Sequence, residues 1–222
     1  MSAAASLPRT RMALLAGRAR LALAEQGRQL LDDKRDALLR ELHREIRTAV
    51  AARRELDAAA AEARLALETA RVRHGADTLA AAGAGAAGEI AVDVRFTTVM
   101  GVPVPAVAPR SFVRPTEARG RDPLTTGPAL EAAAERFEEE LTIALRVATM
   151  EARVLRLARE IRRTSSRVNA LRTWLIPGLE AETAAIELTL EQREREDRFR
   201  LKLVKRRRGR ERGGGLGGAA SP

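Results

Sequence analysis

The chain has 222 residues, of which only 2% are aromatic and none is cysteine or tyrosine. The absence of cysteine excludes disulfides and thiolate metal sites, and the shortage of large rings argues against an ordinary compact globule. The 40 basic and 30 acidic residues give a net charge of +10, which favours an acidic partner such as nucleic acid, anionic lipid or an acidic protein surface.

A long amphipathic helix is predicted from about Thr10 to about His74. Apolar residues recur at every seventh position along most of this segment, starting at Leu14 and Leu21, and the segment contains no proline. Such a repeat is typical of a coiled-coil helix, and its 3.5-residue period implies a left-handed supercoil.

The helical pattern is lost between Gly75 and Pro128. Residues 79–89 are small and glycine-rich, and we expect them to form a flexible linker. Residues 109–128 contain four prolines and are expected to form a loop.

A short β-hairpin is predicted between these two segments. Residues 90–97 alternate in polarity, which predicts a half-buried strand. The apolar positions of that strand are Ile90, Val92, Val94 and Phe96. The stretch MGVPVP at 100–105 supplies a turn and a second extended segment. Because a two-stranded ribbon is marginal alone, it must pack on the helices or on a partner.

A second long helix is predicted from about Ala129 to about Arg208. Steps of three and four residues place apolar side chains on one face of it. Pro177 interrupts this seam, which then resumes, so we interpret the site as a kink in a continuous helix with the lost hydrogen bond near Thr173. The tail that follows is glycine-rich and is predicted to be disordered.

The expected fold is all-α: a long antiparallel two-helix coiled coil with a small central head containing a short β-hairpin. Two helices of similar length fold back so that each buries the other's apolar stripe. The two chain termini should then lie together at one end, and the hairpin and loop should form a broader head at the other. The expected segments are helices at 10–74 and 129–208, a linker and hairpin head at 75–128, and a disordered tail at 209–222.

No catalytic, cofactor or metal site is predicted. GAGAAG at 83–88 matches the dinucleotide-binding pattern, but that pattern needs a strand before it and a helix after it, and the predicted order here is reversed. No P-loop motif occurs, and His43 and His74 lack a second ligand at metal-binding spacing. The carboxylates of Asp32, Asp33 and Asp36 are better explained as helix-surface charge pairs than as acid–base groups.

The strongest charge feature is the stretch at residues 191–210. Glutamate–arginine pairs at i,i+4 spacing stiffen its first part by about 0.2–0.5 kcal/mol each, and its second part is basic. Three interpretations stay open: a solvated helix face, an acidic protein partner, or nucleic acid. Nucleic acid is the weakest of these, because Phe199 is the only aromatic side chain nearby that can stack on bases.

Three blocks of the sequence resemble the D subunit of V-type ATPases and ATP synthases. They are LLDDKRDAL at 30–38, VMGVPVP at 99–105 and RVNALRTWLIPGLEAE at 167–182. The blocks occur in the same order as in that family, and the resemblance covers most of the chain.

The resemblance implies a non-catalytic central rotor shaft. The terminal end of its helical pair would enter a hexamer of alternating catalytic and regulatory subunits. The other end would bind the small F subunit of the central stalk and a funnel-like subunit on the membrane rotor ring. The expected hexamer contacts are Thr10, Arg11, Met12, Leu15, Arg198, Arg200, Lys202 and Lys205. The expected head contacts are Val99, Met100, Gly101, Val102 and Pro103.

Such a shaft would couple ATP synthesis or hydrolysis in other subunits to proton or sodium transport. It would act on the cytoplasmic side of the cell membrane as a peripheral part of the complex, since no secretory signal or membrane span is evident. A bend at Pro177 would make the shaft asymmetric within a threefold ring. The alternatives from other classes are a basic coiled-coil nucleic-acid-binding protein and a homodimeric structural coiled coil.

Overall fold

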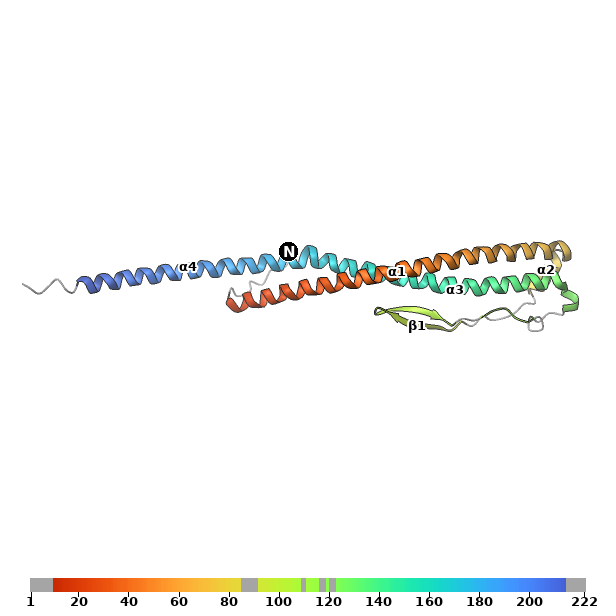
Figure 1. Cartoon of the computed structure of the whole chain (residues 1–222), viewed down its shortest axis with the longest axis horizontal. Helices are drawn as coiled ribbons and strands as arrows, with labels where there is room; N and C mark the ends of the chain where they lie inside the picture. Colours follow the sequence, from red (N-terminus) through yellow and green to blue (C-terminus); the bar gives the residue numbers. More distant parts are fainter. Residues whose placement is uncertain (1–9, 85–91, 109–110, 116–118, 120–122, 215–222) are drawn as a thin grey trace, which may run out of the picture. The chain divides into compact units, whose positions relative to one another are not determined.

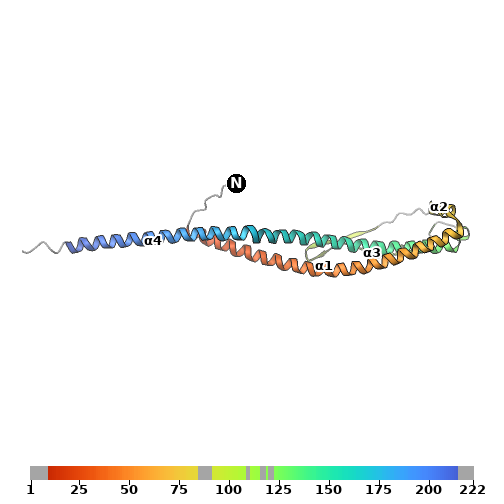
Figure 2. The ribbon, with the colours of Figure 1, turned by 90° about the horizontal axis from the view of Figure 1, so that it is seen from above.

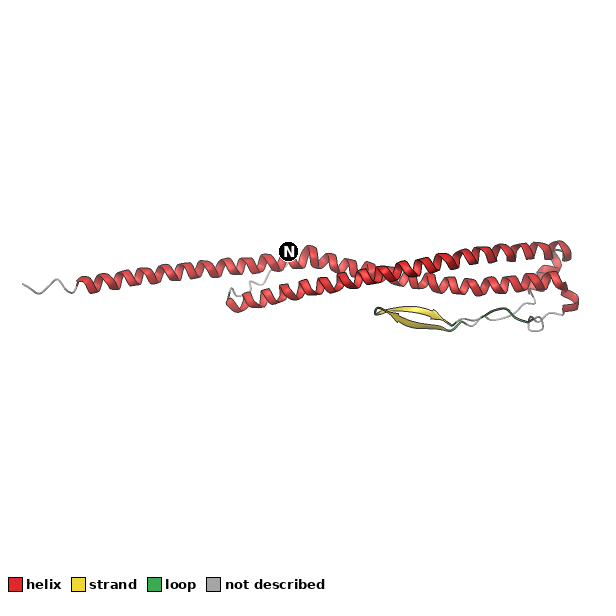
Figure 3. Cartoon of the chain, viewed as in Figure 1, coloured by secondary structure: helices red, strands yellow, loops and turns green. Residues whose placement is uncertain are grey.

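The computed structural model describes residues 10–84, 92–108, 111–115, 119 and 123–214. The fold is the one predicted: all-α, with two long helical arms paired antiparallel as a coiled coil and one small hairpin (Figures 1 and 3). In chain order the elements are α1 (Arg11–His74), α2 (Ala76–Ala84), β1 (Val94–Val99), β2 (Val102–Val107), α3 (Pro123–Ala170), the π-helical turn η2 (Leu171–Leu175) and α4 (Ile176–Gly214). Residues 209–214 of the predicted disordered tail are helical and belong to α4, whereas residues 215–222 lie outside the described part.

The chain divides into two compact units, which we call the terminal unit (Met1–Asp32 with Ser166–Pro222) and the central unit (Asp33–Ser165). Both α1 and α3 contribute residues to each unit. We describe the two units separately.

In the terminal unit, the first helix is capped and paired. Thr10 accepts a hydrogen bond at its Oγ1 from the Ala13 backbone N–H (3.2 Å), which satisfies one of the free donors at the start of α1. Arg11 forms an ion pair with Glu194 (2.6 Å), and Arg18 forms one with Glu187. The partner's number falls as the α1 number rises, so α1 and α4 run antiparallel. Figures 1 and 2 show α4 continuing past the first residue of α1.

In the central unit, α1 and α3 also run antiparallel, and they lie side by side in both views (Figures 1 and 2). Cross-helix ion pairs join them at increasing α1 positions: Lys34–Glu160 (3.8 Å), Glu45–Arg153 (2.9 Å) and Glu62–Arg136 (3.3 Å). The seam between the helices is rich in alanine. Its buried α1 positions are Leu38, Ala52, Ala60, Ala63 and Ala70.

The end of α1 shows one element that the sequence reading missed. Gly75 takes a positive φ of 81° and ends α1, and the short helix α2 follows at once. The flexible linker predicted for residues 79–89 is therefore wrong up to Ala84, because a run of alanine favours helix. Leu79 of α2 packs on a small core with Ala70 and Leu130. Residues 85–88, the rest of the GAGAAG pattern, lie outside the described residues.

The hairpin closes through a two-residue turn. Met100 (φ 51°) and Gly101 (φ 82°) both have positive φ, as a tight turn matching the strand twist requires. Val99 pairs with Val102 beside this turn. Val102 and Val104 are buried against Leu38 and Leu157 of the central unit.

The predicted buried face of the hairpin is wrong. Val94 and Phe96 are exposed, Val92 is exposed as well, and Ile90 lies outside the described residues. Side chains on one face of a ribbon alternate along each strand, and β2 offers two valines to the helices from the opposite face. Pro103 and Pro105 lie on the outer face together with Val94 and Phe96.

The predicted position of the hairpin is also corrected. The sequence predicts that the hairpin broadens the end of the coiled coil where the helices turn back. Its valines instead contact Leu38, which lies far along α1 from the end of that helix at His74. The hairpin thus packs alongside the helical pair of the central unit, and this contact meets the requirement that the ribbon be supported.

Candidate partner-binding surfaces

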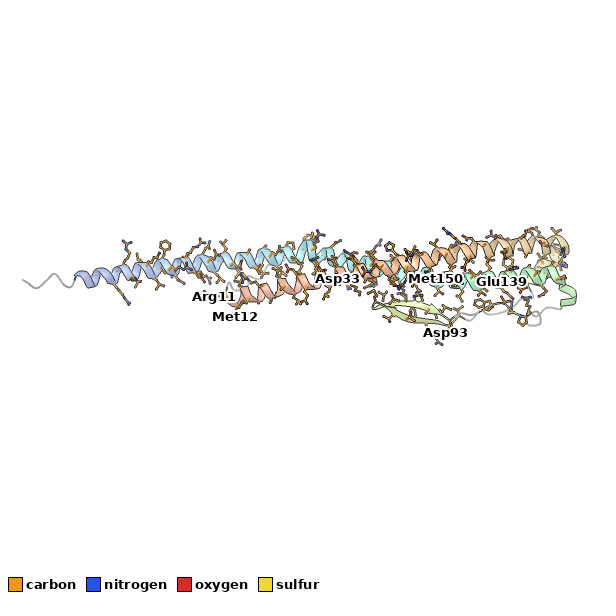
Figure 4. The ribbon with its side chains drawn as sticks, viewed as in Figure 1. Arg11, Met12, Asp33, Asp93, Glu139 and Met150 are labelled. Carbon is orange, nitrogen blue, oxygen red and sulfur yellow. The ribbon has the colours of Figure 1, made fainter. Side chains whose placement is uncertain are left out.

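The first turn of α1 exposes both charge and apolar surface. Figure 4 labels Arg11 and Met12 there. Arg11 is engaged with Glu194, and Thr10 serves as the helix cap. Met12 is 74% exposed, and Leu15 is also largely exposed. Two of the four predicted contacts in this turn are therefore apolar side chains that nothing in the described chain covers.

The last part of α4 extends as a single helix. Arg11, the first residue of α1, pairs with Glu194, so the part of α4 after Glu194 has no α1 residue opposite it. Arg198 also pairs with Glu194 (3.6 Å), from within α4. The other predicted basic contacts in this part are Arg200, Lys202 and Lys205, which are exposed and, within the described residues, form no ion pair.

Apolar side chains accompany these charges, and only one of them, Phe199, is considered in the sequence analysis. Phe199 is 76% exposed, and Leu201, Leu203 and Val204 are also largely exposed. An exposed face that mixes basic and apolar residues is more typical of a protein interface than of a solvated helix. The signal was present in the sequence, because these residues interleave with the basic ones.

The predicted head contacts separate into two groups. Met100, Gly101 and Pro103 are exposed at or beside the turn of the hairpin, where a partner can reach them. Val102 is only 5% exposed and belongs to the chain's own core, and Val99 packs beside it. The exposed outer face of the hairpin adds Phe96, which the sequence reading had assigned to the buried side.

Pro177 is the second residue of α4, and only Ile176 separates it from η2. The backbone is helical on both sides of η2, at Ala170 (φ −62°, ψ −44°) and Ile176 (φ −62°, ψ −52°). The Ile176 N–H donates to the carbonyl of Leu171, so the chain enters Pro177 through a widened turn. Proline lacks the N–H that would close the next hydrogen bond, and a π-turn is one way in which a helix continues past it.

A buried ion cluster holds the segment before α3 to that helix. The Arg119 side chain is only 4% exposed and donates to Glu131 (2.6 Å) and Glu138 (2.9 Å). The backbone N–H of Arg114 donates to Glu138 as well (2.9 Å), and the Phe112 N–H donates to Thr142 Oγ1 (3.0 Å). The sequence predicts only a loop here, because these partners are distant in sequence and no local pattern links them.

The electrostatics of this cluster favour the ionised carboxylate. Burial alone raises the pKa of Glu138, but hydrogen bonds from Arg119 and Arg114 outweigh burial and hold that pKa below its ordinary value. The hydrogen bond to Glu138 raises the pKa of Arg119, although burial opposes this. The cluster is a structural clasp that holds the described residues Phe112, Arg114 and Arg119 on α3.

The central unit has a hollow of about 480 Å³ between the end of β2 and α3. Its apolar lining includes Val107, Ile143 and Met150, the last of which is labelled in Figure 4. Arg146 and Arg153 also line it, and both are paired with glutamates of α1, Glu55 and Glu45. Both guanidinium groups are held in those ion pairs, and the buried Nε of Arg153 has no hydrogen-bond partner within the described residues, but no observation indicates a ligand for this hollow.

Two of the three acidic residues considered for acid–base chemistry lie in ion pairs along α1. Asp32 pairs with Arg28 (2.9 Å), and Asp36 pairs with Arg35 (2.9 Å). The His43 ring contacts the Leu39 carbonyl one turn earlier (2.8 Å). The described residues contain no cluster of three or more potential metal ligands. Nor does any helix in the described ranges have the length and apolarity needed to cross a bilayer.

Comparison with known proteins gives one consistent match. The model of the ATP synthase D-subunit family matches residues 13–206. The V-type ATP synthase D subunit of Anaeromyxobacter sp. (strain Fw109-5) is 42% identical over 203 residues, covering 91% of this chain and 94% of that protein. The A-type ATP synthase D subunit of Thermococcus gammatolerans is 40% identical over 196 residues, covering 88% of this chain and 92% of that protein.

Proposed function

Because the chain belongs to the ATP synthase D-subunit family, we propose that it is the central rotor shaft of a V-type ATPase or ATP synthase. It transmits torque between a catalytic hexamer and a membrane ion-translocating ring. In this role it couples ATP synthesis or hydrolysis in other subunits to proton or sodium transport, and it performs no catalysis itself.

The observation that carries this proposal is the pairing of two long helices by ion pairs in both units, with an alanine-rich seam in the central unit. Antiparallel pairs such as Arg18–Glu187 in the terminal unit and Glu45–Arg153 in the central unit tie the two helical arms to each other. A torque-bearing element has to resist twisting, and two helices bonded along their length do so better than one.

The hexamer contacts are proposed at the free end of the terminal unit. The relevant residues are Thr10, Arg11, Met12 and Leu15 of the α1 end and Arg198, Arg200, Lys202 and Lys205 of α4. Their support is the exposed basic and apolar surface of α4 beyond Glu194, which no α1 residue covers. Acidic loops of the hexamer would attract this surface while allowing it to slide, because charge attraction does not require interlocking side chains.

The remaining partners are proposed for the central unit. The small F subunit and the funnel-like subunit on the membrane ring would bind there, with Met100, Gly101 and Pro103 of the hairpin among the contacts. The protein would then be peripheral, on the cytoplasmic side of the membrane. Pro177 and the π-turn before it would set the curvature that makes the shaft asymmetric inside a threefold hexamer.

Reconstitution tests this function directly. The full chain is mixed with the catalytic and regulatory subunits, and the expected result is a stable complex in which a bead attached to this chain rotates during ATP hydrolysis. A complex that forms without rotation would contradict the torque role. Binding of the chain to duplex DNA at physiological salt, with no binding to the hexamer, would favour the nucleic-acid alternative instead.

A further inference from the structure

The terminal unit exposes the only tryptophan of the chain. Trp174 is 81% exposed, and it lines a shallow hollow of about 600 Å³. The other lining residues are Leu31, Arg167, Ala170, Leu171 and Leu175. We call these six residues the Trp174 hollow. Leaving so large a side chain in water forgoes a sizeable gain in free energy, because tryptophan buries about 150–250 Å² when it is covered.

The π-turn explains why this apolar surface stays open. The coiled-coil seam is buried before η2 at Val168 and after it at Thr183 and Ile186, but no residue of η2 itself is buried. A π-turn widens the helix and rotates the following side chains relative to an unbroken α-helix. Leu171, Trp174 and Leu175 are therefore not buried in the seam. Trp174 and Leu175 are exposed, and Leu171 is partly buried.

On the helical segment that carries Trp174, all the charged side chains near the hollow are positive. Residues 161–179 include four arginines and no carboxylate. Of these, Arg167 lines the hollow and Arg172 is exposed beside it, and the described residues provide neither with an ion-pair partner. A partner that fits this surface carries an aliphatic side chain flanked by carboxylates, since interfaces pair opposite charges around an apolar centre.

We propose that the Trp174 hollow is a docking site for an acidic-rimmed apolar surface of a hexamer subunit. The proposal rests on the function above, because it takes the partner from that complex. The aliphatic lining from Leu31, Leu171 and Leu175 favours an apolar side chain over a stacked base. Tryptophan and arginine together form the usual composition of an interface hot spot. This contact is apolar at its centre, unlike the mainly basic surface proposed at the end of α4.

The absence of cysteine from the chain makes a clean test possible. Trp174→Cys and Asn169→Cys each introduce the only cysteine, and Asn169 is an exposed control on the same helix that does not line the hollow. Each variant is alkylated with iodoacetamide as the full free chain and within the complex reconstituted with the hexamer. Modification of this chain is followed by mass spectrometry. We expect the complex to slow alkylation at position 174 by about tenfold or more relative to position 169.

A binding measurement completes the test. Trp174→Ala is expected to weaken assembly with the hexamer by about tenfold or more, whereas Asn169→Ala leaves it unchanged. The helix content of the free chain should not change, because Trp174 is exposed. Equal alkylation of position 174 in the free chain and in the assembled complex would overturn the docking site while leaving the shaft function intact. Failure of the unmodified chain to assemble would overturn both, and protection of position 174 by duplex DNA alone would replace this partner with nucleic acid.

Discussion

At the scale of single residues, Gly127 has a role that no sequence pattern revealed. It lies just before Pro128 with a φ of 69° and a ψ of 160°, a conformation open almost only to glycine. A Cβ at this position would lie 2.6 Å from Cε1 of His74, the last residue of α1. The sequence suggests for His74 only the role of a metal ligand, yet its ring fills the space that the missing side chain leaves at the start of α3.

Gly127→Ala is therefore expected to destabilise the central unit by about 1–3 kcal/mol, from backbone strain together with the clash against His74. Gly27→Ala is the matched control. Gly27 lies within α1 with nothing near its would-be Cβ, so alanine should stabilise the helix by about 1 kcal/mol. Thermal unfolding followed by circular dichroism measures both variants. Equal melting temperatures would show that the contact with His74 is unimportant.

The ion cluster at Glu138 gives a pH dependence with a definite sign. Its folded pKa is lowered, so its contribution to stability is complete above the ordinary pKa of glutamate and is lost as the pH falls through the folded value. Protection of the Arg114 amide, which donates to Glu138, should fall by about tenfold between pH 6 and pH 3 after correction for intrinsic exchange. Hydrogen exchange by NMR measures this change. Glu138→Gln should remove the pH dependence; an unchanged profile in that variant would assign the effect to another group.

At the scale of elements, the long helices were predictable from the sequence, whereas the packed face of the hairpin and the π-turn were not. The heptad repeat located α1 because it depends only on spacing along the chain. Which face of the hairpin is buried depends on which face packs better against Leu38 and Leu157. The alternation at Val94 and Phe96 carries no information about that choice. The π-turn was likewise invisible, because proline predicts a lost hydrogen bond but not how the helix absorbs it.

The hairpin attachment can be tested with adjacent residues on opposite faces. Val104→Asp places a carboxylate in the fully buried contact with Leu38 and Leu157, where an unpaired charge costs several kcal/mol, so the hairpin should detach while the helices stay paired. Pro103→Asp adds the same charge to the exposed face and should have little effect. Hydrogen exchange of β1 and β2, with circular dichroism to monitor the helices, distinguishes the two. Equal protection of the strands in both variants would contradict the assigned face.

At the scale of the whole molecule, the net charge of +10 is unevenly distributed along the sequence. Many arginines of α1 and α3 are used in ion pairs across or along the helices, such as Arg153 with Glu45. After Asp197 the sequence is strongly basic up to Arg208, and the described structure offers most of these residues no acidic partner. The sequence alone predicts this surplus charge. Only the pairing of Arg11 with Glu194 shows that the charge lies on the part of α4 that extends past the start of α1.

Removing the surplus positive charge after Asp197 should reduce both the affinity for the hexamer and the dependence of that affinity on salt. We expect the combined change of Arg198, Arg200, Lys202 and Lys205 to glutamine to reduce affinity for the hexamer by about tenfold at low salt, with little difference at high salt, where charges are screened within about 3 Å. A control with the same loss of charge replaces Arg40, Arg47, Arg54 and Arg64 of α1, which are exposed. Titrations at several salt concentrations measure both. An equal loss of affinity in the control would indicate a net-charge effect without a specific contact.

The alanine seam of the central unit has a consequence for alignment. Small, similar side chains such as Ala63 and Ala70 form a nearly smooth track, on which one helix can shift by a heptad and still find equivalent neighbours. The hairpin removes that freedom, because Val102 and Val104 touch Leu38 on one helix and Leu157 on the other at the same time. The hairpin therefore fixes the register between the two helices. A chain without it would keep both helices but lose their single register.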